Sequence, residues 1–442
     1  MRRSLAPQAG RGHGQGVNAA AENAPEAALV ARRAALTLLQ AALARRGGLE
    51  EALSAGRYLS LSPQDRGFAR AVAMATLRRL GPIDRALDAR LSREPPAPAR
   101  DLLRLGLAQA FWLDTPAFAA VDTTVSLAPK PLRGLVNAVL RAILRQGRPD
   151  DSPEFLAPPW LLARWRAAFG ESEALAIAAQ SAVEPATDLT LRDPADAAMA
   201  TELEAESLAE GSLRLVRRGD VATWPGYDEG RWWVQDRAAA LPTRLLRARP
   251  GETALDLCAA PGGKTLQLAA AGAVVTALDQ SAGRLRRVTA ALARTGLTAE
   301  THAVDAGAWP DARHFDAVLL DAPCTATGTF RRHPDVLWNA KPGDIPALVQ
   351  VQARLLASAA GRVRPGGRLV YSVCSLEPEE GEAQARGFLA AHAEFALDPI
   401  EAGEAGSPPA SRASEGWLRV LPHHADGGLD GFFIARFRRR AG

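Results

Sequence analysis

The sequence predicts a multidomain protein with an all-helical N-terminal domain, a small α+β connector and a C-terminal α/β domain built on a doubly wound sheet. Two observations support this fold class. Apolar residues recur at helical spacing in the first third of the chain, and strand-like runs alternate with helical runs from residue 236 onward. The chain of 442 residues has room for about three domains of roughly 100 to 200 residues each.

Residues 1–26 have no apolar periodicity, and their glycines alternate with polar residues, so we expect a flexible arm there. Residues 27–147 are predicted to form the helical domain. Leu36, Leu39 and Leu43 illustrate its helical apolar spacing, and pairs of glycine or proline separate the successive helices.

The connector is predicted at residues 148–235, where two short strand-like runs, 188–191 and 212–216, lie among aromatic pairs. The C-terminal domain is predicted at residues 236–442. Its strand-like runs are residues 253–257, 273–278, 300–304, 315–320, 367–373, 395–399 and 432–437. Because helical runs separate these strands, we expect a parallel sheet with helices on both faces.

The composition excludes several classes of protein. No run approaches the roughly 18 consecutive apolar residues of a membrane span, so we expect no membrane association. The three cysteines lack CxxC spacing, which argues against a disulfide framework or a zinc ribbon and fits a reducing cytoplasm. The net charge of +4 is weak evidence for a nucleic acid partner, and the lack of a sustained heptad predicts a monomer.

Residues that carry chemistry follow the predicted strands of the C-terminal domain. In a doubly wound sheet, ligands bind beyond the carboxyl ends of the strands. The candidate residues at these ends are Cys258, Ala259, Ala260, Pro261, Gly262, Gly263, Lys264, Asp279, Asp305, Asp321, Cys324 and Cys374. Because parallel strands end at the same edge, we expect all three cysteines on one rim.

The first of these loops imitates a phosphate-binding P-loop. Residues 263–265 read Gly-Lys-Thr before a helix, and Asp321 closes an apolar run as a Walker B acid does. The imitation is incomplete, because Cys258 stands where a P-loop needs glycine and Pro261 removes a backbone donor. A P-loop ATPase is therefore the less favoured interpretation.

A nucleoside cofactor fits the same residues better. Asp279 ends the second strand, the position of a carboxylate that accepts both hydroxyls of an adenosine ribose. The loop lacks the G-x-G-x-x-G pattern of NAD sites, and hydride transfer has no role for two thiols. S-adenosylmethionine is therefore predicted, with Asp305 at the adenine amine, residues 258–264 at the amino acid end and Asp321 beside the methyl group.

Cys324 and Cys374 are each followed by threonine or serine rather than by core residues, which indicates a chemical role. Carbon 5 of a pyrimidine is a poor nucleophile. A thiolate that adds to carbon 6 makes carbon 5 enamine-like, and the thiol leaves after methylation and loss of the carbon 5 proton. Two thiols at one pocket therefore favour pyrimidine methylation, while Cys258 is interpreted as a small hydrophobic residue.

Three long motifs resemble the signature motifs of the RNA 5-methylcytosine methyltransferases. They are residues 255–265, residues 321–335 from Asp-Ala-Pro-Cys to Arg-Arg-His-Pro-Asp, and residues 371–375 with the Pro-Glu-Glu of 378–380. In the helical region, residues 100–106 and 136–141 resemble a NusB-like domain. Together these motifs are similar to the Sun/Fmu-type 16S rRNA methyltransferases over nearly the whole chain after residue 26.

The resemblance implies a Rossmann-like, S-adenosylmethionine-dependent methyltransferase domain that acts on cytosine in 16S rRNA or a precursor of the small ribosomal subunit. It also implies that Cys374 is the nucleophile, that Cys324 assists product release and that Asp321 belongs to the catalytic site. The residues alone leave the order of the two thiols open. The alternative, a non-catalytic ribosome-assembly factor with a vestigial methyltransferase fold, is disfavoured because Asp279 and both thiols are retained.

The RNA side of the site is predicted at Arg331, Arg332 and His333, where the arginines would clamp the phosphates that flank a flipped cytosine. A solvated charged turn is the alternative for these residues. His423 and His424 are adjacent and are not expected to bind one ion together, so no metal site is predicted.

The chain departs from the family pattern at three positions. Ala326 replaces a glycine after the strand-four cysteine, Val373 replaces a threonine before the nucleophile, and Gly381 replaces an asparagine after Glu-Glu. We expect Ala326 to narrow the approach of the base and Val373 to remove a hydroxyl from the site.

Overall fold

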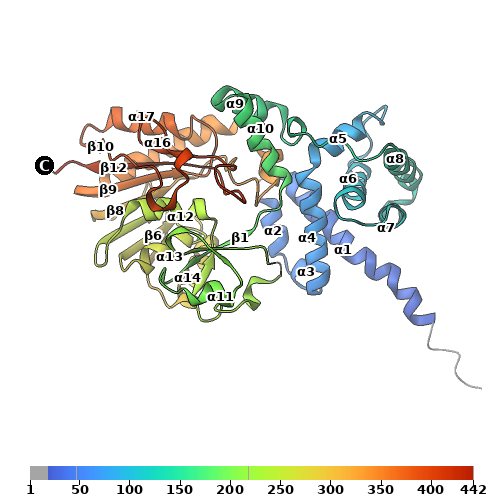
Figure 1. Cartoon of the computed structure of the whole chain (residues 1–442), viewed down its shortest axis with the longest axis horizontal. Coiled ribbons are helices and arrows are strands. Elements are labelled where there is room, and N and C mark those ends of the chain that lie inside the picture. The colour runs from blue at the N-terminus through green and yellow to red at the C-terminus, as the bar shows by residue number, and fades with distance from the viewer. Residues whose placement is uncertain (1–17, 46, 218, 442) are drawn as a thin grey trace, which may run out of the picture. The chain divides into compact units, whose positions relative to one another are not determined.

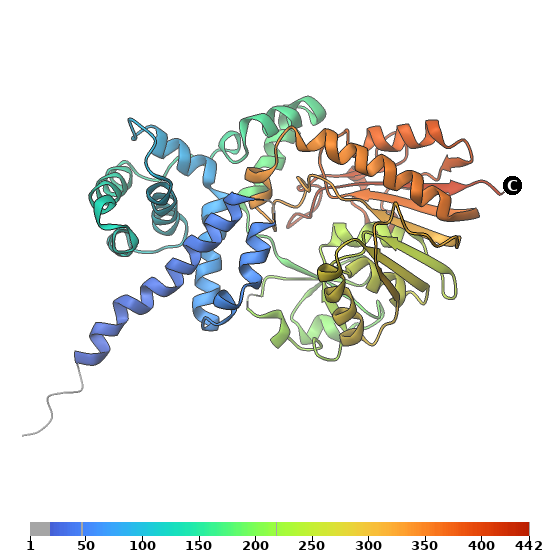
Figure 2. The ribbon, with the colours of Figure 1, turned by 180° about the vertical axis from the view of Figure 1, so that it is seen from behind.

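The computed structural model describes residues 18–441 except residues 46 and 218. The chain forms two compact units, Met1–Asp150 and Asp151–Gly442, and Figure 1 and Figure 2 show the elements of both units from opposite sides. The predicted connector therefore folds in the same unit as the C-terminal domain, apart from its first residues. Within the described residues, no helix is both long enough and apolar enough to cross a membrane.

The predicted arm is only partly within the described residues. Residues 1–17 lie outside them, whereas residues 18–26 belong to helix α1 (Asn18–Ala44), so the expected lack of helical structure is wrong for this stretch. Alanine dominates the start of α1 and has the highest helix propensity of any residue. A search for apolar periodicity alone does not detect this helix propensity.

The first unit is all-helical, as predicted. Its helices are α1, α2 (Gly48–Ser54), α3 (Gly56–Leu59), α4 (Pro63–Arg78), α5 (Leu80–Asp88), α6 (Ala97–Trp112), α7 (Ala117–Leu127) and α8 (Arg133–Gln146). Leu102 and Leu103 of α6 share a buried core with Leu140 and Ile143 of α8. Gly106 allows α6 to approach α8 closely, because a Cβ atom at this position would lie 3.0 Å from Leu140 Cδ2.

The second unit begins with two helices and a small antiparallel sheet. The helices are α9 (Pro159–Phe169) and α10 (Glu171–Ala179). The strands, in the order β2-β3-β1-β4, are β1 (Thr187–Leu191), β2 (Glu206–Ser207), β3 (Ser212–Leu215) and β4 (Trp232–Val234), with α11 (Ala198–Glu202) between β1 and β2. The predicted α+β character is confirmed. Strands β2 and β4 were not predicted, because runs this short show no readable alternation.

The large sheet of this unit has the order β10-β12-β9-β8-β5-β6-β7, with β11 beside β12. Its strands are β5 (Thr253–Leu257), β6 (Val274–Asp279), β7 (Glu300–Ala303), β8 (Phe315–Asp321), β9 (Val363–Val373), β10 (Phe395–Leu397), β11 (Leu418–Val420) and β12 (Phe432–Arg439). Strands β5 to β9 pair in parallel, as predicted, but β10, β11 and β12 are antiparallel to their neighbours. The prediction of a wholly parallel sheet is wrong at this edge, because a buried apolar run does not reveal the direction of its strand.

Helices cover both faces of the large sheet. They are α12 (Arg237–Leu246), α13 (Gly263–Ala270), α14 (Ala282–Thr295), α16 (Asp344–Arg362) and α17 (Glu382–Ala391). The short helix α15 (Asp335–Asn339) packs instead in a core with α9 and α10. Val318 and Leu320 of β8 pack in a core with α16 and α17, whereas Ala317 and Leu319 pack in a core with α12 and α13. Because successive side chains alternate between faces, each strand serves both cores, and its polar carboxyl end stays at the rim.

Candidate active site

A cavity of about 290 Å³ lies at the carboxyl ends of the parallel strands. Its wall includes the carboxylates Asp279, Asp305 and Asp321 and the thiols Cys258, Cys324 and Cys374. Each of the parallel strand ends that the sequence analysis selected supplies at least one of these groups. The tertiary structure thus brings residues from distant parts of the sequence to one pocket.

The loop between β5 and α13 turns sharply at the edge of this cavity. Cys258 has a φ of 65° and Gly262 has a φ of 115°, both in the left-handed region. A Cβ atom on Gly262 would lie 3.3 Å from Val288 Cα, so this position requires glycine. Cys258 adopts its conformation at a cost of roughly 1 to 2 kcal/mol, because its Cβ crowds the following carbonyl group.

Backbone hydrogen bonds hold the loop against the end of β6. The N–H of Ala259 donates to Leu278 O at 2.8 Å, and the N–H of Ala260 donates to Asp279 Oδ2 at 3.1 Å. Ala260 and Pro261 line the cavity. The other predicted loop residues shape the turn or lie behind the wall, namely Ala259, Gly262, Gly263 and Lys264.

Asp279 is 3% exposed and retains free acceptor capacity at the cavity. Its Oδ1 accepts a hydrogen bond from the N–H of Ser281 at 2.9 Å, and its Oδ2 accepts the bond from Ala260. An ionised carboxylate offers about four acceptor sites, so lone pairs remain for the hydroxyls of a bound ligand. This carboxylate therefore fits the predicted task of holding a ribose.

Asp305 follows β7 and is more exposed than Asp279. Hydrogen bonds from Arg354 Nη1 and from the N–H of Gly307 lower the pKa of Asp305, which keeps it ionised. Val304 and Leu355 add apolar surface to the cavity wall beside it. Apolar walls with a few placed acceptors are what a flat, partly apolar base requires, so this end of the cavity fits an adenine.

Lys264 links the loop after β5 to the thiol site. Its Nζ lies 2.7 Å from Asp321 Oδ2, and Ser372 Oγ donates to Asp321 Oδ1 at 2.8 Å. Burial opposes the charge on Lys264, but the neighbouring Asp321 charge and hydrogen bond raise the pKa of Lys264 above its ordinary value. The ammonium also lies near enough to Cys374 for their charges to interact.

The two predicted reactive thiols lie side by side, with Cys324 Sγ 3.5 Å from Cys374 Sγ. The hydrogen bond with Cys374, burial and the negative charge of Glu380 raise the pKa of Cys324 well above its ordinary value. Burial raises the pKa of Cys258 to about 12, and its side chain packs against the hydrophobic core. The two reactive thiols therefore have different charged neighbours, Lys264 at Cys374 and Glu380 at Cys324.

Glu380 is a central residue of the site to which the sequence analysis assigned no role. Its fully buried carboxylate accepts hydrogen bonds from Thr325 N–H at 2.9 Å, Gln352 Nε2 at 3.0 Å and Ser375 Oγ at 2.5 Å, and a further short one from Thr325 Oγ1. The only signal in the sequence was the Pro-Glu-Glu motif. That motif does not reveal which residues its carboxylates contact.

Asp256 lies beneath the loop and is fully buried, with Oδ2 accepting a hydrogen bond from Thr265 Oγ1 at 2.6 Å. Burial raises the pKa of Asp256 to about 7. The folded protein therefore keeps a proton on this group between about pH 4 and pH 7 that the unfolded chain has lost. Its contribution to stability is fully present below about pH 4 and falls as the pH rises to about 7.

Replacing Asp256 with asparagine should remove this pH dependence, because the amide oxygen still accepts from Thr265 but cannot ionise. The difference in unfolding free energy between wild type and variant should change by about 1.4 kcal/mol per pH unit at most between pH 5 and pH 6.5. Urea unfolding at several pH values measures this difference. A difference that stays constant with pH would show that Asp256 is ionised in the folded protein.

Arg331 and Arg332 do not form the predicted phosphate clamp. Arg331 is 1% exposed and its Nη2 donates to Gly427 O at 2.7 Å, while Arg332 Nη2 pairs with Asp236 Oδ2 at 2.6 Å. Neither guanidinium is free to bind RNA in this structure. The sequence could not show this, because the compensating acid lies about a hundred positions away. His333 is partly exposed, and its RNA contact stays a prediction.

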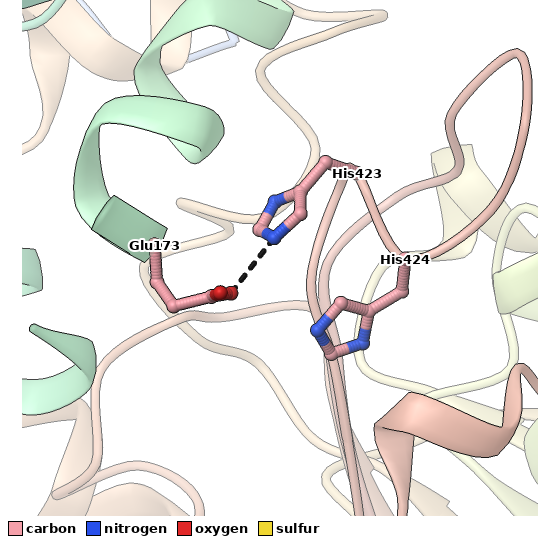
Figure 3. Close-up of side chains that lie close together, drawn as sticks. All are labelled: Glu173, His423 and His424. Carbon is pink, nitrogen blue, oxygen red and sulfur yellow. Dashed lines mark hydrogen bonds and ion pairs between the residues drawn. The ribbon is translucent and has the colours of Figure 1, made fainter.

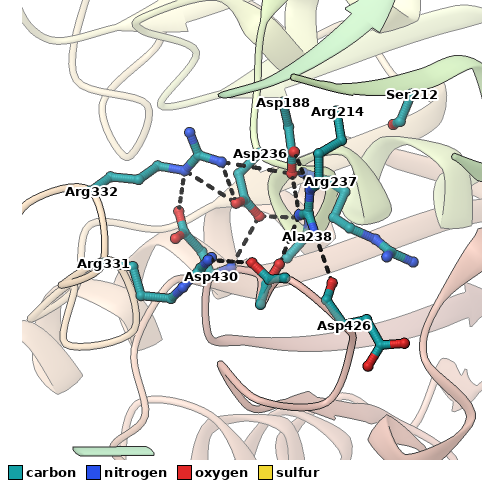
Figure 4. Close-up of polar contacts among 12 residues, drawn as sticks. Asp188, Ser212, Arg214, Asp236, Arg237, Ala238, Arg331, Arg332, Asp426 and Asp430 are labelled. Atoms are coloured by element: carbon teal, nitrogen blue, oxygen red, sulfur yellow. Dashed lines mark hydrogen bonds and ion pairs between the residues drawn. The ribbon is translucent and has the colours of Figure 1, made fainter. Parts of the chain in front are cut away.

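Arg332 belongs to a buried ionic network that joins the small sheet to the large one (Figure 4). Arg332 pairs with Asp236, with Asp430 Oδ2 at 3.5 Å and with Asp188 Oδ2 at 3.7 Å. Arg214 Nε donates to Asp188 Oδ1 at 2.7 Å. Burial and the neighbouring Asp236 charge raise the pKa of Asp430 to about 8. The network therefore serves the packing of this unit.

A histidine cluster lies between α10 and the segment after β11 (Figure 3). Potential ligand atoms of Glu173, His423 and His424 lie within 4.8 Å of one another. That the two histidines do not bind one ion together stays a prediction. His423 Nε2 pairs with Glu173 Oε2 at 2.8 Å. Leu421 N–H donates to His424 Nδ1 at 3.3 Å, which leaves the proton of a neutral His424 on Nε2. One nitrogen of each imidazole takes part in these hydrogen bonds, and we assign no ion to the cluster.

The three departures from the family pattern have different structural settings. Ala326 lines the cavity with a φ of 59°, which agrees with the expectation that it narrows the site. Val373 is fully buried in the core beneath the sheet, so the expected loss of a hydroxyl at the site is wrong. A Cβ atom on Gly381 would lie 2.4 Å from Arg419 Nη2, and Arg419 Nη1 donates to Ser375 O at 2.6 Å. Arg419 thus occupies the space that a side chain at position 381 would need.

Comparison with known proteins agrees with this architecture. Residues 243–438 match the 16S rRNA methyltransferase RsmB/F family, and residues 29–145 match the NusB family. The crystal structure of PH0851 is similar with a TM-score of 0.76 and 26% identity, over 93% of this chain and 99% of that one. The crystal structure of NSun6 from Pyrococcus horikoshii with SFG shares the fold with a TM-score of 0.57 and 20% identity, over 64% of this chain and 99% of that one.

Two curated relatives resemble nearly the full length of the chain. The ribosomal RNA small subunit methyltransferase B of Xanthomonas campestris pv. campestris is 38% identical over 410 residues, which is 87% of this chain and 92% of the relative. The probable ribosomal RNA small subunit methyltransferase B of Synechocystis sp. is 33% identical over 418 residues, which is 86% of this chain and 92% of the relative. This chain, with its NusB domain, therefore belongs to the ribosomal RNA small subunit methyltransferase B family of S-adenosylmethionine-dependent rRNA methyltransferases.

Proposed function

We propose that this protein methylates carbon 5 of a cytosine in 16S rRNA through a covalent adduct with Cys374. The observation that carries the proposal is the pair of thiols, Cys324 and Cys374, 3.5 Å apart in the cavity wall. Methyl transfer to a ring nitrogen or a hydroxyl requires no thiol, whereas addition to carbon 6 requires one thiolate nucleophile. The Lys264 charge near Cys374 and the Glu380 charge near Cys324 distinguish the two thiols accordingly.

The cofactor end of the cavity would hold S-adenosylmethionine through Asp279 at the ribose, Asp305 at the adenine and residues 258–264 at the amino acid end. The apolar walls beside Asp305 and the spare acceptor sites of Asp279 support this fit. When bound, the cofactor supplies an electrophilic methyl group. Asp321 forms the floor of the cavity between the cofactor end and the thiols, and it holds Lys264 beside Cys374.

The thiols would act in sequence on the cytosine. The thiolate of Cys374 forms a bond to carbon 6, and the electrons of the carbon 5–carbon 6 double bond move to carbon 5, which then takes the methyl group. Loss of the carbon 5 proton to water restores the double bond and returns the carbon–sulfur electron pair to Cys374. Cys374 leaves as the thiolate that began the cycle, and Cys324, which burial and nearby negative charge keep protonated, assists by donating a hydrogen bond to the departing sulfur.

Incubation of the purified protein with methyl-labelled S-adenosylmethionine and unmodified 16S rRNA tests the proposed function. We expect label in 5-methylcytidine after digestion of the RNA and mass spectrometry of the nucleosides. The Cys374→Ala variant serves as the control for non-enzymatic label. RNA that is bound but not labelled would instead favour the assembly-factor interpretation, and label in another nucleoside would refute carbon 5 of cytosine as the target.

Replacing Asp279 with alanine should weaken the binding of S-adenosylmethionine by about 2 to 3 kcal/mol, because buried ribose hydroxyls would lose their acceptors. Titration calorimetry with the purified variant measures the change. Asp305→Ala is the matched comparison, since its more exposed carboxylate should contribute less than Asp279 does. Equal affinities of wild type and Asp279→Ala would contradict the assigned ribose contact.

A further inference from the structure

Glu380 connects the two segments that carry the reactive thiols. Of its hydrogen-bond donors, Thr325 directly follows Cys324 in the sequence, and Ser375 directly follows Cys374. These two segments come from different strand ends, β8 and β9. The two segments also contact each other directly, because Thr325 Oγ1 lies 2.9 Å from Ser375 Oγ and the N–H of Gly328 donates to Cys374 O at 2.9 Å. Glu380 adds a carboxylate that accepts hydrogen bonds from both segments at once.

A third donor connects Glu380 to the covering helix. Gln352 of α16 donates through Nε2 to Glu380 Oε1 at 3.0 Å and to Pro323 O at 3.0 Å, one residue before Cys324. The carboxylate is 0% exposed, and all the donors that bond to it are uncharged. Hydrogen bonds from several donors are what allow a carboxylate to remain buried without a cation. This geometry fixes Glu380 in one position beneath the thiols.

The position of Glu380 makes the surroundings of the two thiols unequal. Its negative charge acts on Cys324, whereas the positive charge of Lys264 acts on Cys374. A negative neighbour disfavours a thiolate and a positive neighbour favours it. Because the sulfur atoms are only 3.5 Å apart, two thiolates would repel each other strongly, so a single charge must settle on one of them.

We propose that Glu380 is a positioning residue that sets the spacing of the two active-site thiols and directs the nucleophilic role to Cys374 by its charge. This inference rests on the proposed two-thiol function. It adds a residue that touches neither cofactor nor base and acts only through Thr325, Ser375 and Cys324. The charge and the length of the Glu380 side chain can be tested separately. Aspartate keeps the charge on a shorter side chain, and glutamine keeps the shape without the charge.

The charge is tested by alkylation of the purified full-length protein with iodoacetamide, followed by peptide mass spectrometry of each cysteine over a range of pH. In the wild type, Cys374 should react faster than Cys324 near neutral pH. In Glu380→Gln, the rate at Cys324 at pH 8 should rise above the wild-type rate, because removal of a nearby negative charge lowers the pKa of this thiol. Glu379→Gln is the matched control, because Glu379 is the neighbouring residue, 49% exposed and paired with Arg164 on the surface.

The Glu380→Asp variant tests the length of the side chain. It also keeps the proposal testable if Glu380→Gln does not fold. This variant should keep the wild-type order of alkylation, but its methyl transfer should fall by more than about tenfold because a misplaced group weakens positioned chemistry. An unchanged Cys324 profile in folded Glu380→Gln would overturn the charge effect, and full activity of Glu380→Asp would overturn the positioning effect. Alkylation needs neither RNA nor cofactor. A failure of the proposed function would appear as no 5-methylcytidine from the wild type, whereas a failure of this inference would appear in the alkylation profiles, so the two are distinguishable.

Discussion

Replacing Cys374 with alanine is expected to abolish methyl transfer, because the cavity wall then lacks the thiol that the proposed mechanism adds to carbon 6. Without the adduct at carbon 6, carbon 5 of the cytosine stays a poor nucleophile. The measurement is incorporation of labelled methyl groups into unmodified 16S rRNA. Residual incorporation above the no-enzyme background would refute Cys374 as the nucleophile.

Replacing Cys324 with alanine should impair the release of the adduct rather than its formation. The adduct with Cys374 still forms, but the group that donates a hydrogen bond to the departing sulfur is missing, so RNA-linked protein should accumulate. A denaturing gel after incubation with RNA and cofactor detects that species. Cys258→Ala is the matched control, since it removes the third thiol of the same wall and should trap no adduct. Accumulation in Cys374→Ala rather than Cys324→Ala would reverse the order of the thiols.

Replacing Arg332 with alanine is expected to destabilise the second unit by about 3 to 5 kcal/mol, because Asp236 and Asp430 would remain buried without their cation. The pKa of Asp430 is already raised to about 8 by burial and by the Asp236 charge, and loss of the guanidinium would increase that repulsion. Urea unfolding monitored by tryptophan fluorescence measures the loss of stability.

A surface ion pair provides the control for Arg332. Arg364 pairs with Asp316 through a side chain that is 56% exposed, so Arg364→Ala should cost less than about 1 kcal/mol. An RNA-binding role for Arg332 makes a different prediction, namely unchanged stability with weaker RNA binding and a smaller dependence on salt. That outcome would restore the phosphate clamp that the buried position of Arg332 contradicts.

Several features of the site could be predicted because their determinants are local in the sequence. Strands β5 to β9 were predicted from apolar runs, and the residues at their carboxyl ends were selected because parallel strands end at one edge. Asp279, Asp305 and Asp321 lie in the cavity wall for this reason. Glycine is required at position 262 by a positive φ, which the turn between strand and helix demands.

Other features depend on contacts between distant segments, which residue types alone do not specify. Arg332 is held in ion pairs because Asp236 and Asp430 come to it from other elements, and His423 meets Glu173 across 250 positions of the chain. The helical start of α1 and the antiparallel edge of the large sheet were also missed, since neither alters the apolar pattern that was used to predict them.

The sequence by itself determined that this protein has a helical domain followed by an α/β domain with acids and thiols at its strand ends, because hydrophobic period and strand-end position are local properties. Only the tertiary structure placed the two thiols 3.5 Å apart and gave them different charged neighbours. Lys264 and Glu380 belong to different loops, and their charges act on Cys374 and Cys324 only after the strands pair. Electrostatic interaction depends on distance in space, so the roles of two chemically identical groups follow from the fold.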